Sequence, residues 1–420
     1  MQRERERERE RDEAAPKNRA LSKNQILNNN GENQASNNDK SQNPNSKNEI
    51  HAPQESQNSI KTTNSNESQI LDTKQNPRLE KSKLFSEKLE FHNLALGSCT
   101  CIQNLYELHR ERNQKILANA ALIVTESNVN SICNSHRDPF PLAVAFRNIY
   151  LFYKSLGALQ KPVVSILLPT ETNPNKDKIN DFHKKMCAKF GINLIDIAAY
   201  ADGLNLTQGF IAKIDIHHIQ SAIMREFGRQ IALNLANFAA PKSLPKGFKA
   251  PKFCILTPKD MSVICGDFEE IHQKNSMYDE VAYKMTKPTA ARFAPSLKGH
   301  FLLAFHSWND GNPWSTTQNL SKFILKNDST SLIKSVWSPN VVIEFHNEFV
   351  LDEASFLLYR LDEIAKFTET YHAAQFSDPA HTISPFLNLI SFFLMESREF
   401  LAQKREFETA LNEPPSELDT

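Results

Sequence analysis

The sequence predicts an α/β domain with a parallel sheet covered by helices on both faces, followed by a mostly β module. Between Phe91 and Phe238, short apolar runs of strand length alternate with segments of helical periodicity. Several of these runs are apolar throughout, which is typical of parallel strands buried on both faces. After about residue 252 the helical pattern weakens, and short candidate strands are separated by turn-forming stretches.

The elements of the α/β domain follow in chain order. The predicted strands are residues 91–96, 120–124, 163–168 and 192–197. The predicted helices are residues 100–116, 141–156, 176–190 and 221–238. Lys161-Pro162 stops the second helix, and Gly191 is placed to end the third as a C-terminal cap.

The N-terminal region, residues 1–80, opens with alternating Arg and Glu and continues rich in Asn, Ser, Lys and Gln. It is too polar to fix a core against chain entropy, so we expect a disordered low-complexity tail. The domains then follow as 85–240 for the α/β domain and 253–420 for a β-rich accessory domain that ends in a helix. Residues 241–252, with three prolines and four lysines, form the predicted linker between them.

Composition bounds the class of protein. The chain has 420 residues, and 49 Lys and Arg balance 49 Asp and Glu, so charge gives no argument for nucleic acid or an anionic membrane as partner. Six scattered cysteines, with Cys99 and Cys101 one residue apart, suggest reduced thiols. The charged N-terminus has no secretory h-region, and the most apolar late stretch is too short to span a bilayer. We therefore expect a cytoplasmic protein without a membrane span.

Polar residues follow the predicted strands at three places. Gly97-Ser98 follows the first strand, Glu126-Ser127-Asn128 follows the second, and Asp215-x-x-His218 lies in a loop before the last helix. In parallel sheets, sites gather at the carboxyl ends of strands. Each residue also suits an ordinary role: Asn128 could cap a turn, and Asp215 could be a loop residue. His217 and His218 with Asp215 do not extend to a further His or Cys cluster, so no metal site is predicted.

Taken as an ordered set, these residues resemble the SGNH (GDSL-like) hydrolase family over about residues 90–238. Ser98 matches the nucleophile of the family's first block, and Asn128 matches the asparagine of its third block. Asp215 and His218 match the Asp-x-x-His of the fifth block. The first-block aspartate is missing, and Glu126 replaces a glycine. The family's second block, a glycine on a loop, has no evident counterpart in the roughly 30 residues between Ser98 and Asn128.

The resemblance implies a flavodoxin-like parallel sheet and a serine esterase that removes an O-acyl group, such as acetyl, from a carbohydrate or small molecule without a cofactor. His218 would be the general base for Ser98, and Asp215 would orient it. The Ser98 N–H and the Asn128 amide would bind the oxyanion, where one donor contributes about 3 kcal/mol. Losing the second-block glycine would thus slow hydrolysis about a hundredfold unless it is replaced. The alternatives are a non-catalytic glycan- or protein-binding descendant, and an acyltransferase in cell-envelope polysaccharide modification.

The C-terminal region reads as a β module, and a sandwich fits its pattern. Its candidate strands are residues 253–256, 261–264, 300–305, 341–345 and 356–361. Trp308 and Trp314 end a turn-rich loop, where they suit sugar stacking or, alternatively, anchoring of the loop on the sandwich. Glu344, His346 and Glu348 alternate along one predicted strand, which we interpret as a solvated edge. Residues 383–411 are expected to form a long helix.

Overall fold

The computed structural model describes most of the chain after residue 89. The described residues are 90–97, 99–135, 141–170, 173–212, 215–241, 244, 248–275, 278–309, 318–336, 340–361, 367–369 and 381–412. At 215–217, 318–320, 367 and 381–383 only the backbone is described. The tail predicted at residues 1–80 lies outside these ranges. Residues Gln75–Thr420 belong to one compact unit.

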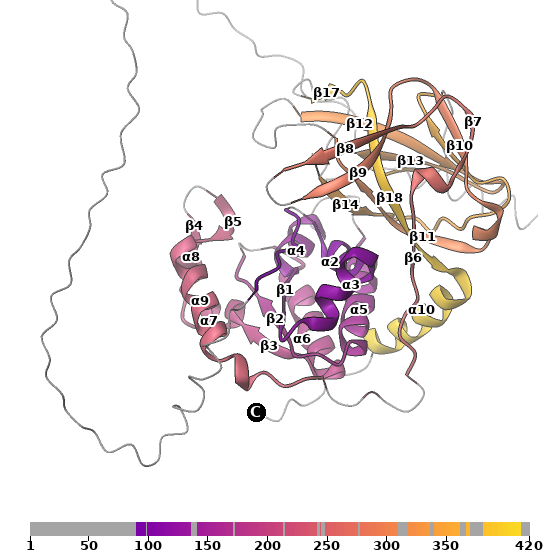
Figure 1. Cartoon of the computed structure of the whole chain (residues 1–420). Coiled ribbons are helices and arrows are strands. Elements are labelled where there is room, and N and C mark those ends of the chain that lie inside the picture. Colours follow the sequence, from indigo (N-terminus) through magenta and orange to yellow (C-terminus); the bar gives the residue numbers. More distant parts are fainter. Residues whose placement is uncertain are drawn as a thin grey trace, which may run out of the picture. The chain divides into compact units, whose positions relative to one another are not determined.

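A parallel sheet lies at the centre of the α/β part, as predicted (Figure 1). It consists of β1 (Ile123–Glu126), β2 (Val163–Leu167) and β3 (Asn193–Asp196), paired in that order. Val124 lies opposite Val164, and Ile166 lies opposite Ile195. The central strand β2 is buried along its whole length, which explains why all its residues but Ser165 are apolar.

The helices of this part agree in place with the predicted ones, with additions. They are α2 (Cys101–His109), α3 (Glu111–Asn119), α4 (Asn128–Ser135), α5 (Leu142–Ala158), α6 (Lys176–Phe190), α7 (Ile197–Gly203), α8 (Thr207–Phe210), α9 (Ser221–Leu233) and the 3₁₀ turn η2 (Leu235–Asn237). Gly191 ends α6 in the left-handed conformation, at φ 66°, as predicted.

The helix predicted at residues 100–116 is two helices. Arg110 between them is extended, with φ −69° and ψ 130°, so the chain turns after α2. The carbonyls freed at this break are covered by side chains, because Asn113 Nδ2 donates to Glu107 O at 3.0 Å and Gln114 Nε2 donates to Leu108 O at 2.9 Å.

Two further predictions for this part are wrong. Residues 91–96 are irregular rather than a strand, and Phe91 is 88% exposed, so apolar character here does not reflect burial in a sheet. Asp215 and His218 do not lie in a loop. They belong to β5 (Asp215–Ile219), which forms an antiparallel hairpin with β4 (Ile211–Ala212).

The C-terminal part is β-rich, as predicted, and its described strands form two sheets. One sheet has the order β14-β11-β18-β9-β8, with β6 also paired to β18; the other has the order β16-β13-β12-β15-β10-β7, with β17 paired to β12. The strands are β6 (Cys254–Leu256), β7 (Ser262–Cys265), β8 (Glu269–Lys274), β9 (Asp279–Met285), β10 (Thr289–Arg292), β11 (His300–Ser307), β12 (Gln318–Lys326), β13 (Ser331–Val336), β14 (Val341–Glu344), β15 (Phe356–Tyr359), β16 (Phe367–Glu369), β17 (His381–Ile383) and β18 (Leu387–Glu396). Two 3₁₀ turns, η3 (Pro258–Asp260) and η4 (Pro295–Leu297), connect them.

Aromatic rings fill the space between the two sheets. Phe323 of β12 meets Phe305 of β11 edge-on at a centroid distance of 5.0 Å, and it meets Phe392 of β18 at 6.1 Å. Edge-to-face contacts of this kind are favoured by the ring quadrupoles and add to the hydrophobic gain. The rings therefore hold the two sheets face to face.

The prediction of one long helix at residues 383–411 is wrong for its first half. Its first half is the strand β18, and only the second half is helical, as α10 (Ser397–Asn412). All but the last residue of β18 are buried, because this strand lies inside its sheet between β11 and β9. An apolar run buried on all sides has the same composition in a strand and in a helix, which is why the pattern did not separate them.

The last helix, α10, returns to the α/β part, as the yellow helix of Figure 1 shows. The Lys154 ammonium of α5 is ion-paired with Glu406 of α10, and the Tyr150 hydroxyl donates to the same carboxylate at 2.9 Å. Phe407 packs on Tyr150 with ring centroids 6.1 Å apart. A single cluster of buried apolar residues runs through both parts. None of the described helices is both long and apolar enough to cross a membrane.

Candidate functional site

Three segments that are distant in the sequence come together at the carboxyl end of β1. The Asn104 amide of α2 donates to Glu126 O at 3.1 Å and to Thr125 Oγ1 at 3.3 Å. The Cys101 thiol is hydrogen-bonded to Ser127. His218 of β5 acts electrostatically on the Glu126 carboxylate. The start of α2, the end of β1 and the β4–β5 hairpin therefore share one region of the molecule.

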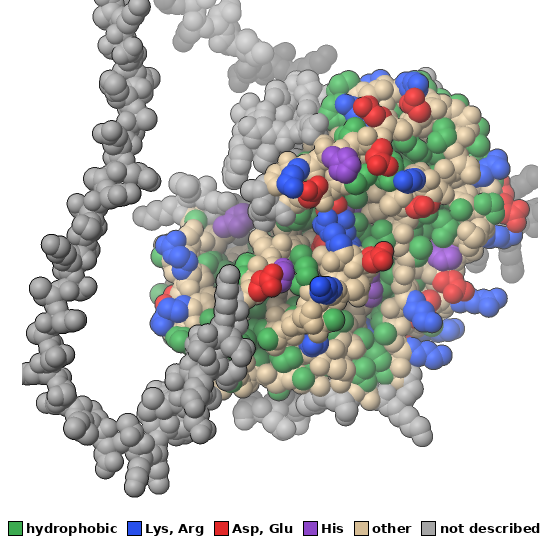
Figure 2. All heavy atoms as spheres, viewed as in Figure 1, with side chains coloured by type: hydrophobic (Ala, Val, Ile, Leu, Met, Phe, Trp, Pro, Cys, Tyr) green, Lys and Arg blue, Asp and Glu red, His purple; other side chains and the backbone are tan. Residues whose placement is uncertain are grey.

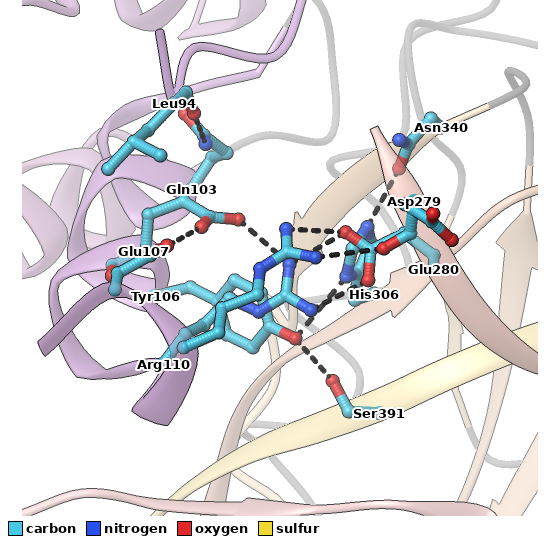
Figure 3. A network of polar contacts seen from close by, with 12 residues as sticks. Leu94, Gln103, Tyr106, Glu107, Arg110, Asp279, Glu280, His306, Asn340 and Ser391 are labelled. Atoms are coloured by element: carbon cyan, nitrogen blue, oxygen red, sulfur yellow. Dashed lines mark hydrogen bonds and ion pairs between the residues drawn. The ribbon is translucent and has the colours of Figure 1, made fainter. Parts of the chain in front are cut away.

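Ser98, the predicted nucleophile, lies outside the described residues, but the chain on both sides of it is described. Before it, Leu94 O accepts a hydrogen bond from Gln103 Nε2 at 2.8 Å (Figure 3). After it, Cys99 and Thr100 are buried and lead directly into α2. Residue 98 thus lies between a segment tied to α2 and the first turn of that helix.

Glu126, which stands where the resembled family has a glycine, is partly exposed and caps a helix. Its Oε1 accepts a hydrogen bond from Val129 N at 3.2 Å in the first turn of α4, where the helix dipole favours a negative charge. Burial raises the pKa of this carboxyl, and the Val129 N–H and the positive form of His218 oppose that rise. Glu126 is therefore a carboxylate within electrostatic reach of the predicted base.

Asn128 is fully buried and joins the ends of two strands. Its Nδ2 donates to Leu168 O and to Asn180 Oδ1, both at 2.9 Å, and its Oδ1 accepts from Leu168 N at 3.1 Å. An amide group has two hydrogens to donate, so both are used inside the protein. Asn128 fixes the chain after β1 to the chain after β2, which suits the structural role that the sequence left open.

His218 and Asp215 lie in the same strand, β5. The His218 side chain is exposed, and for Asp215 only the backbone is described. The register of β5 against β4 shifts between Ile211 and Ala212, so the hairpin contains a bulge. Asp215 and Ile219 are the residues of β5 that pair with β4, so His218 lies within the bulge, and bulges re-aim side chains beside functional sites in many sheets.

The two cysteines nearest residue 98 are unsuited to nucleophilic attack. Cys99 and Cys101 are both buried and unpaired with other cysteines. Burial raises the pKa of the Cys99 thiol to about 12 and that of Cys101 further, so neither forms a thiolate near neutral pH. Among the described residues, no group of three or more His, Cys, Asp or Glu is arranged to hold a metal ion.

Trp308, one of the two predicted sugar contacts, is buried. It packs against Ala282 and Ile390, and its main-chain oxygen accepts from Asn388 Nδ2 at 2.9 Å. These contacts are those of a residue that anchors its loop to the sheet. Trp314, the other predicted contact, lies outside the described residues.

The prediction of a solvated edge at Glu344, His346 and Glu348 is wrong for its first member. Glu344 is 1% exposed, and its carboxylate oxygens accept from Thr100 Oγ1 at 3.2 and 3.1 Å. His346 is half-buried, and only Glu348 is exposed, in an ion pair with Lys404 at 2.8 Å. The alternation was real, but the face it marks is covered by the start of α2, which is 244 residues earlier in the chain.

A second polar network, absent from the sequence-based predictions, holds the same helix from its other end (Figure 3). Arg110 donates to both oxygens of Glu280, at 2.8 and 2.7 Å, and Arg112 donates to the same carboxylate at 2.6 Å. The Tyr106 hydroxyl lies 2.7 Å from Ser391 Oγ and 3.3 Å from His306 Nδ1. Nothing in the sequence signals these pairs, because the partners lie at least 168 residues apart.

Charged side chains of both signs are interspersed over the face of the molecule that Figure 2 shows, in keeping with the net charge of zero. Lys298 with Glu353 and Lys274 with Asp279 are two such surface ion pairs, with N–O distances of 2.9 and 2.6 Å. Exposed pairs of this kind contribute about 0–1 kcal/mol each, so they say little about stability.

No protein-family model matches this chain, and no curated protein matches it. Two solved structures are similar to it in fold. Both are of a two-domain esterase active on acetylated mannans, one of them co-crystallised with mannopentaose. They share 12% and 11% sequence identity with this chain, each with a TM-score of 0.47. Each comparison covers 76% of this chain and 84% of the other.

Proposed function

We propose that the protein is a serine esterase of SGNH type, with a flavodoxin-like α/β domain, that hydrolyses an O-acyl ester of a carbohydrate or small molecule. The observation that supports the proposal is that three segments, each with one block of the family motif, lie close together. They are the start of α2, the end of β1 and the β4–β5 hairpin. Cys101, three residues after Ser98, contacts Ser127 just past the end of β1, and His218 acts on Glu126 at that same end. Such a convergence is what a nucleophile, a base and an oxyanion donor require.

In this mechanism His218 takes the proton from the Ser98 hydroxyl as its Oγ attacks the ester carbonyl carbon. The carbonyl oxygen becomes an oxyanion, which the Ser98 N–H and the Asn128 amide stabilise. The C–O bond to the leaving alcohol then breaks, and the alcohol departs with the proton from His218, leaving an acyl-serine. Water, deprotonated by His218, attacks the acyl-serine and releases the carboxylic acid and free Ser98.

The role of Asn128 carries a specific requirement. Because both of its amide hydrogens are donated to Leu168 O and Asn180 Oδ1, one of these bonds must break when the oxyanion forms. The bond to Leu168 is one of two that join Asn128 to that residue's main chain, whereas the bond to Asn180 joins two side chains, so we expect the Asn180 bond to be the one that breaks. We therefore expect Asn180→Ala to preserve activity, and Asn128→Ala to lower kcat by about a hundredfold.

The test is hydrolysis of p-nitrophenyl acetate by the full chain and by Ser98→Ala and His218→Ala. Both substitutions should abolish turnover, whereas Ser221→Ala, an exposed serine close to His218 in the sequence, should leave it unchanged. Acetate release from acetylated mannan, the substrate class of the similar structure, is a suitable second assay. Turnover that survives Ser98→Ala would remove the nucleophile from the proposal.

The carboxylate partner of His218 is tested separately. Asp215 lies three residues before His218, as in the Asp-x-x-His block of the SGNH family. Glu126 is the carboxylate on which the charge of His218 acts in the structure. Asp215→Asn should lower kcat by about 10⁴-fold if Asp215 orients the imidazole. Glu126→Gln should then change kcat by less than tenfold. The reverse order of effects would assign the orienting role to Glu126.

The second candidate is a non-catalytic descendant that binds a glycan or protein, and the closed hydrogen bonding of Asn128 favours it. In that case folded wild-type protein hydrolyses no ester but binds an O-acetylated oligosaccharide in calorimetry. Ser98→Ala would then leave the affinity unchanged.

A further inference from the structure

The first turn of α2 is attached to the β-rich part through two adjacent residues. Thr100 Oγ1 donates to the Glu344 carboxylate, with distances of 3.1 and 3.2 Å to its two oxygens. The neighbouring Cys99 thiol is hydrogen-bonded to the main chain of Val342. Val342 and Glu344 both belong to β14, so one strand of the β-rich part holds the two residues that follow Ser98.

Thr100 is the N-cap residue of α2, yet its hydroxyl does not cap the helix. A threonine at this position ordinarily accepts a hydrogen bond from a backbone N–H two or three residues later. Here the hydroxyl is a donor to Glu344, and only the Thr100 carbonyl is used within the helix, by Gln103 N at 3.1 Å. The side chain thus serves the contact with β14 in place of the usual helix cap.

Glu344 is held from the other side by a buried ion pair. Lys334 Nζ donates to the main-chain oxygen of Glu344 at 2.6 Å and to Glu369 Oε2 at 2.7 Å. Lys334 and Glu369 are 0% and 1% exposed. The carboxylate of Glu369 also accepts from His346 N at 3.0 Å and from Asn347 N at 2.7 Å. This arrangement fixes the backbone of β14 while the Glu344 side chain faces Thr100.

The charge of Lys334 is matched by Glu369, so Glu344 is not required as its counter-ion. Burial raises the pKa of the Glu344 carboxyl, against the positive charges of Lys334 and Arg147 and the Thr100 hydrogen bond. A buried carboxyl that is costly to ionise needs partners for its oxygens. For Glu344 these are the positive charge of the buried Arg147 guanidinium and the hydrogen bond from Thr100.

We propose that Glu344 is a positioning residue, which fixes the first turn of α2 through Thr100 and so makes the β-rich part a component of the candidate active site. The proposal rests on the proposed function for its effect on catalysis. Its structural content, that the Glu344–Thr100 bond orders residues 99–103, stands independently of any reaction. A displacement of about 1 Å in a nucleophile costs about a hundredfold in rate.

The test is a double-mutant cycle in the full chain with ester hydrolysis as readout. Thr100→Val and Glu344→Leu should each lower kcat by tenfold to a hundredfold with little change in KM, and the double variant should be no slower than either one. Thr100→Ser and Glu344→Gln keep a hydroxyl donor and an oxygen acceptor, so both should restore kcat. The control is Glu348→Gln, on the same segment but exposed and paired with Lys404. Equal kcat in wild type and Thr100→Val would overturn the proposal.

Hydrogen exchange separates this proposal from the proposed function. The amides of Cys101, Ile102 and Gln103 should exchange at least tenfold faster in Thr100→Val and Glu344→Leu than in wild type, and at the wild-type rate in Thr100→Ser. If wild type hydrolyses no ester, the proposed function fails, and the exchange rates alone decide whether Glu344 positions the turn. Unchanged exchange in Glu344→Leu would overturn the positioning role whether or not the protein is an esterase.

Discussion

At the scale of single residues, His306 shows how burial sets the chemistry of an ionisable group in this protein. It is 1% exposed, its Nε2 lies 2.7 Å from Asn340 Oδ1, and its Nδ1 faces the Tyr106 hydroxyl. Burial, reinforced by the positive charge of Arg110, lowers the pKa of His306 to about 4. The nearby Glu280 carboxylate acts in the other direction but does not outweigh burial.

This environment predicts a pH-dependent contribution to stability. The folded-state pKa of His306 lies below its unfolded value of about 6.5, so the unfolded chain binds more protons between pH 6.5 and 4. The stability that His306 contributes is therefore present above pH 6.5 and lost as pH falls towards 4, at up to about 1.4 kcal/mol per pH unit.

The measurement is urea unfolding of wild type and His306→Gln at intervals from pH 7 to pH 4.5. Buried carboxyls with raised pKa values, such as Glu107 and Glu344, shift stability in the opposite direction, but they are common to both proteins and cancel in the difference. The wild type's advantage in unfolding free energy should shrink as the pH falls. An advantage that stays constant over this range would contradict the account of His306.

Residue-level prediction from the sequence used local order, and the catalytic roles that it assigned stay predictions. The spacing of Asp215 and His218 and the position of Asn128 after a strand pointed to one region, and the described contacts of Glu126 and Asn128 lie there. Glu344 could not be assigned, because its alternation with His346 and Glu348 says only that they share a face. What covers that face is Thr100, and long-range pairing of this kind leaves no periodic signal.

At the scale of elements, helix α6 shows a terminus that its sequence specifies. Gly191 adopts φ 66° just after the helix, and the following Ile192 N bonds back to Cys187 O at 2.9 Å. A side chain at this φ meets the backbone, whereas glycine does not.

We predict that Gly191→Ala lowers the free energy of unfolding by about 1–2 kcal/mol, because the left-handed conformation is strained for L residues. The control is Gly203→Ala in α7, where a new Cβ meets no atom within 4 Å. That substitution should be neutral or stabilising by up to about 1 kcal/mol. Chemical denaturation of the two variants beside wild type measures both, and equal effects at the two positions would show that φ is not the cause.

Elements were predictable from sequence when they lie within one run of the chain and one face is polar. Helices α6 and α9 meet that condition, and they were predicted in place. Strands β2 and β18 do not, since both are buried. Strand β2 was nevertheless predicted, because Pro162 and Pro169 limit its run to strand length, whereas the longer apolar run of β18 equally fits a buried helix. The strand predicted at residues 91–96 is wrong for another reason. This run contains the exposed Phe91, and it pairs with no strand among the described residues.

At the scale of the whole molecule, the α/β and β-rich parts behave as one folded body in their contacts. They share a cluster of buried apolar residues, and Arg110 and Arg112 of the α/β part converge on Glu280 of β9. Glu280 is 3% exposed, and the two arginines hold its pKa below the usual range despite its burial. The linker predicted at residues 241–252 lies between the α/β part and the β-rich part. That the two parts fold as separate domains stays a prediction.

We predict that Glu280→Gln destabilises both parts together. The substitution removes the carboxylate that Arg110 and Arg112 share and leaves Arg110 only its longer contact with Glu107, at 3.3 Å, so we expect a cost of up to about 3–5 kcal/mol. The matched control, Glu353→Gln, breaks the exposed pair with Lys298 and should cost less than about 1 kcal/mol.

The readout is denaturant unfolding followed by two probes. All three tryptophans lie between residues 308 and 337, so their fluorescence reports on the β-rich part. Far-UV circular dichroism at the helix band reports mainly on the α/β part, which holds most of the described helices. The two transitions should coincide in wild type and shift together in Glu280→Gln. Transitions that separate, with only one moved by the substitution, would show two independent folding units.

The measurement that tests the central claim most directly is covalent labelling of the full-length protein with a fluorophosphonate probe, followed by peptide mass spectrometry. An activated serine displaces fluoride from the probe, and the phosphonyl group remains bonded to its Oγ. The account predicts one modified residue, Ser98, with labelling lost in His218→Ala and retained in Ser221→Ala. An unlabelled Ser98 in folded wild-type protein, or equal labelling with and without His218, would contradict it.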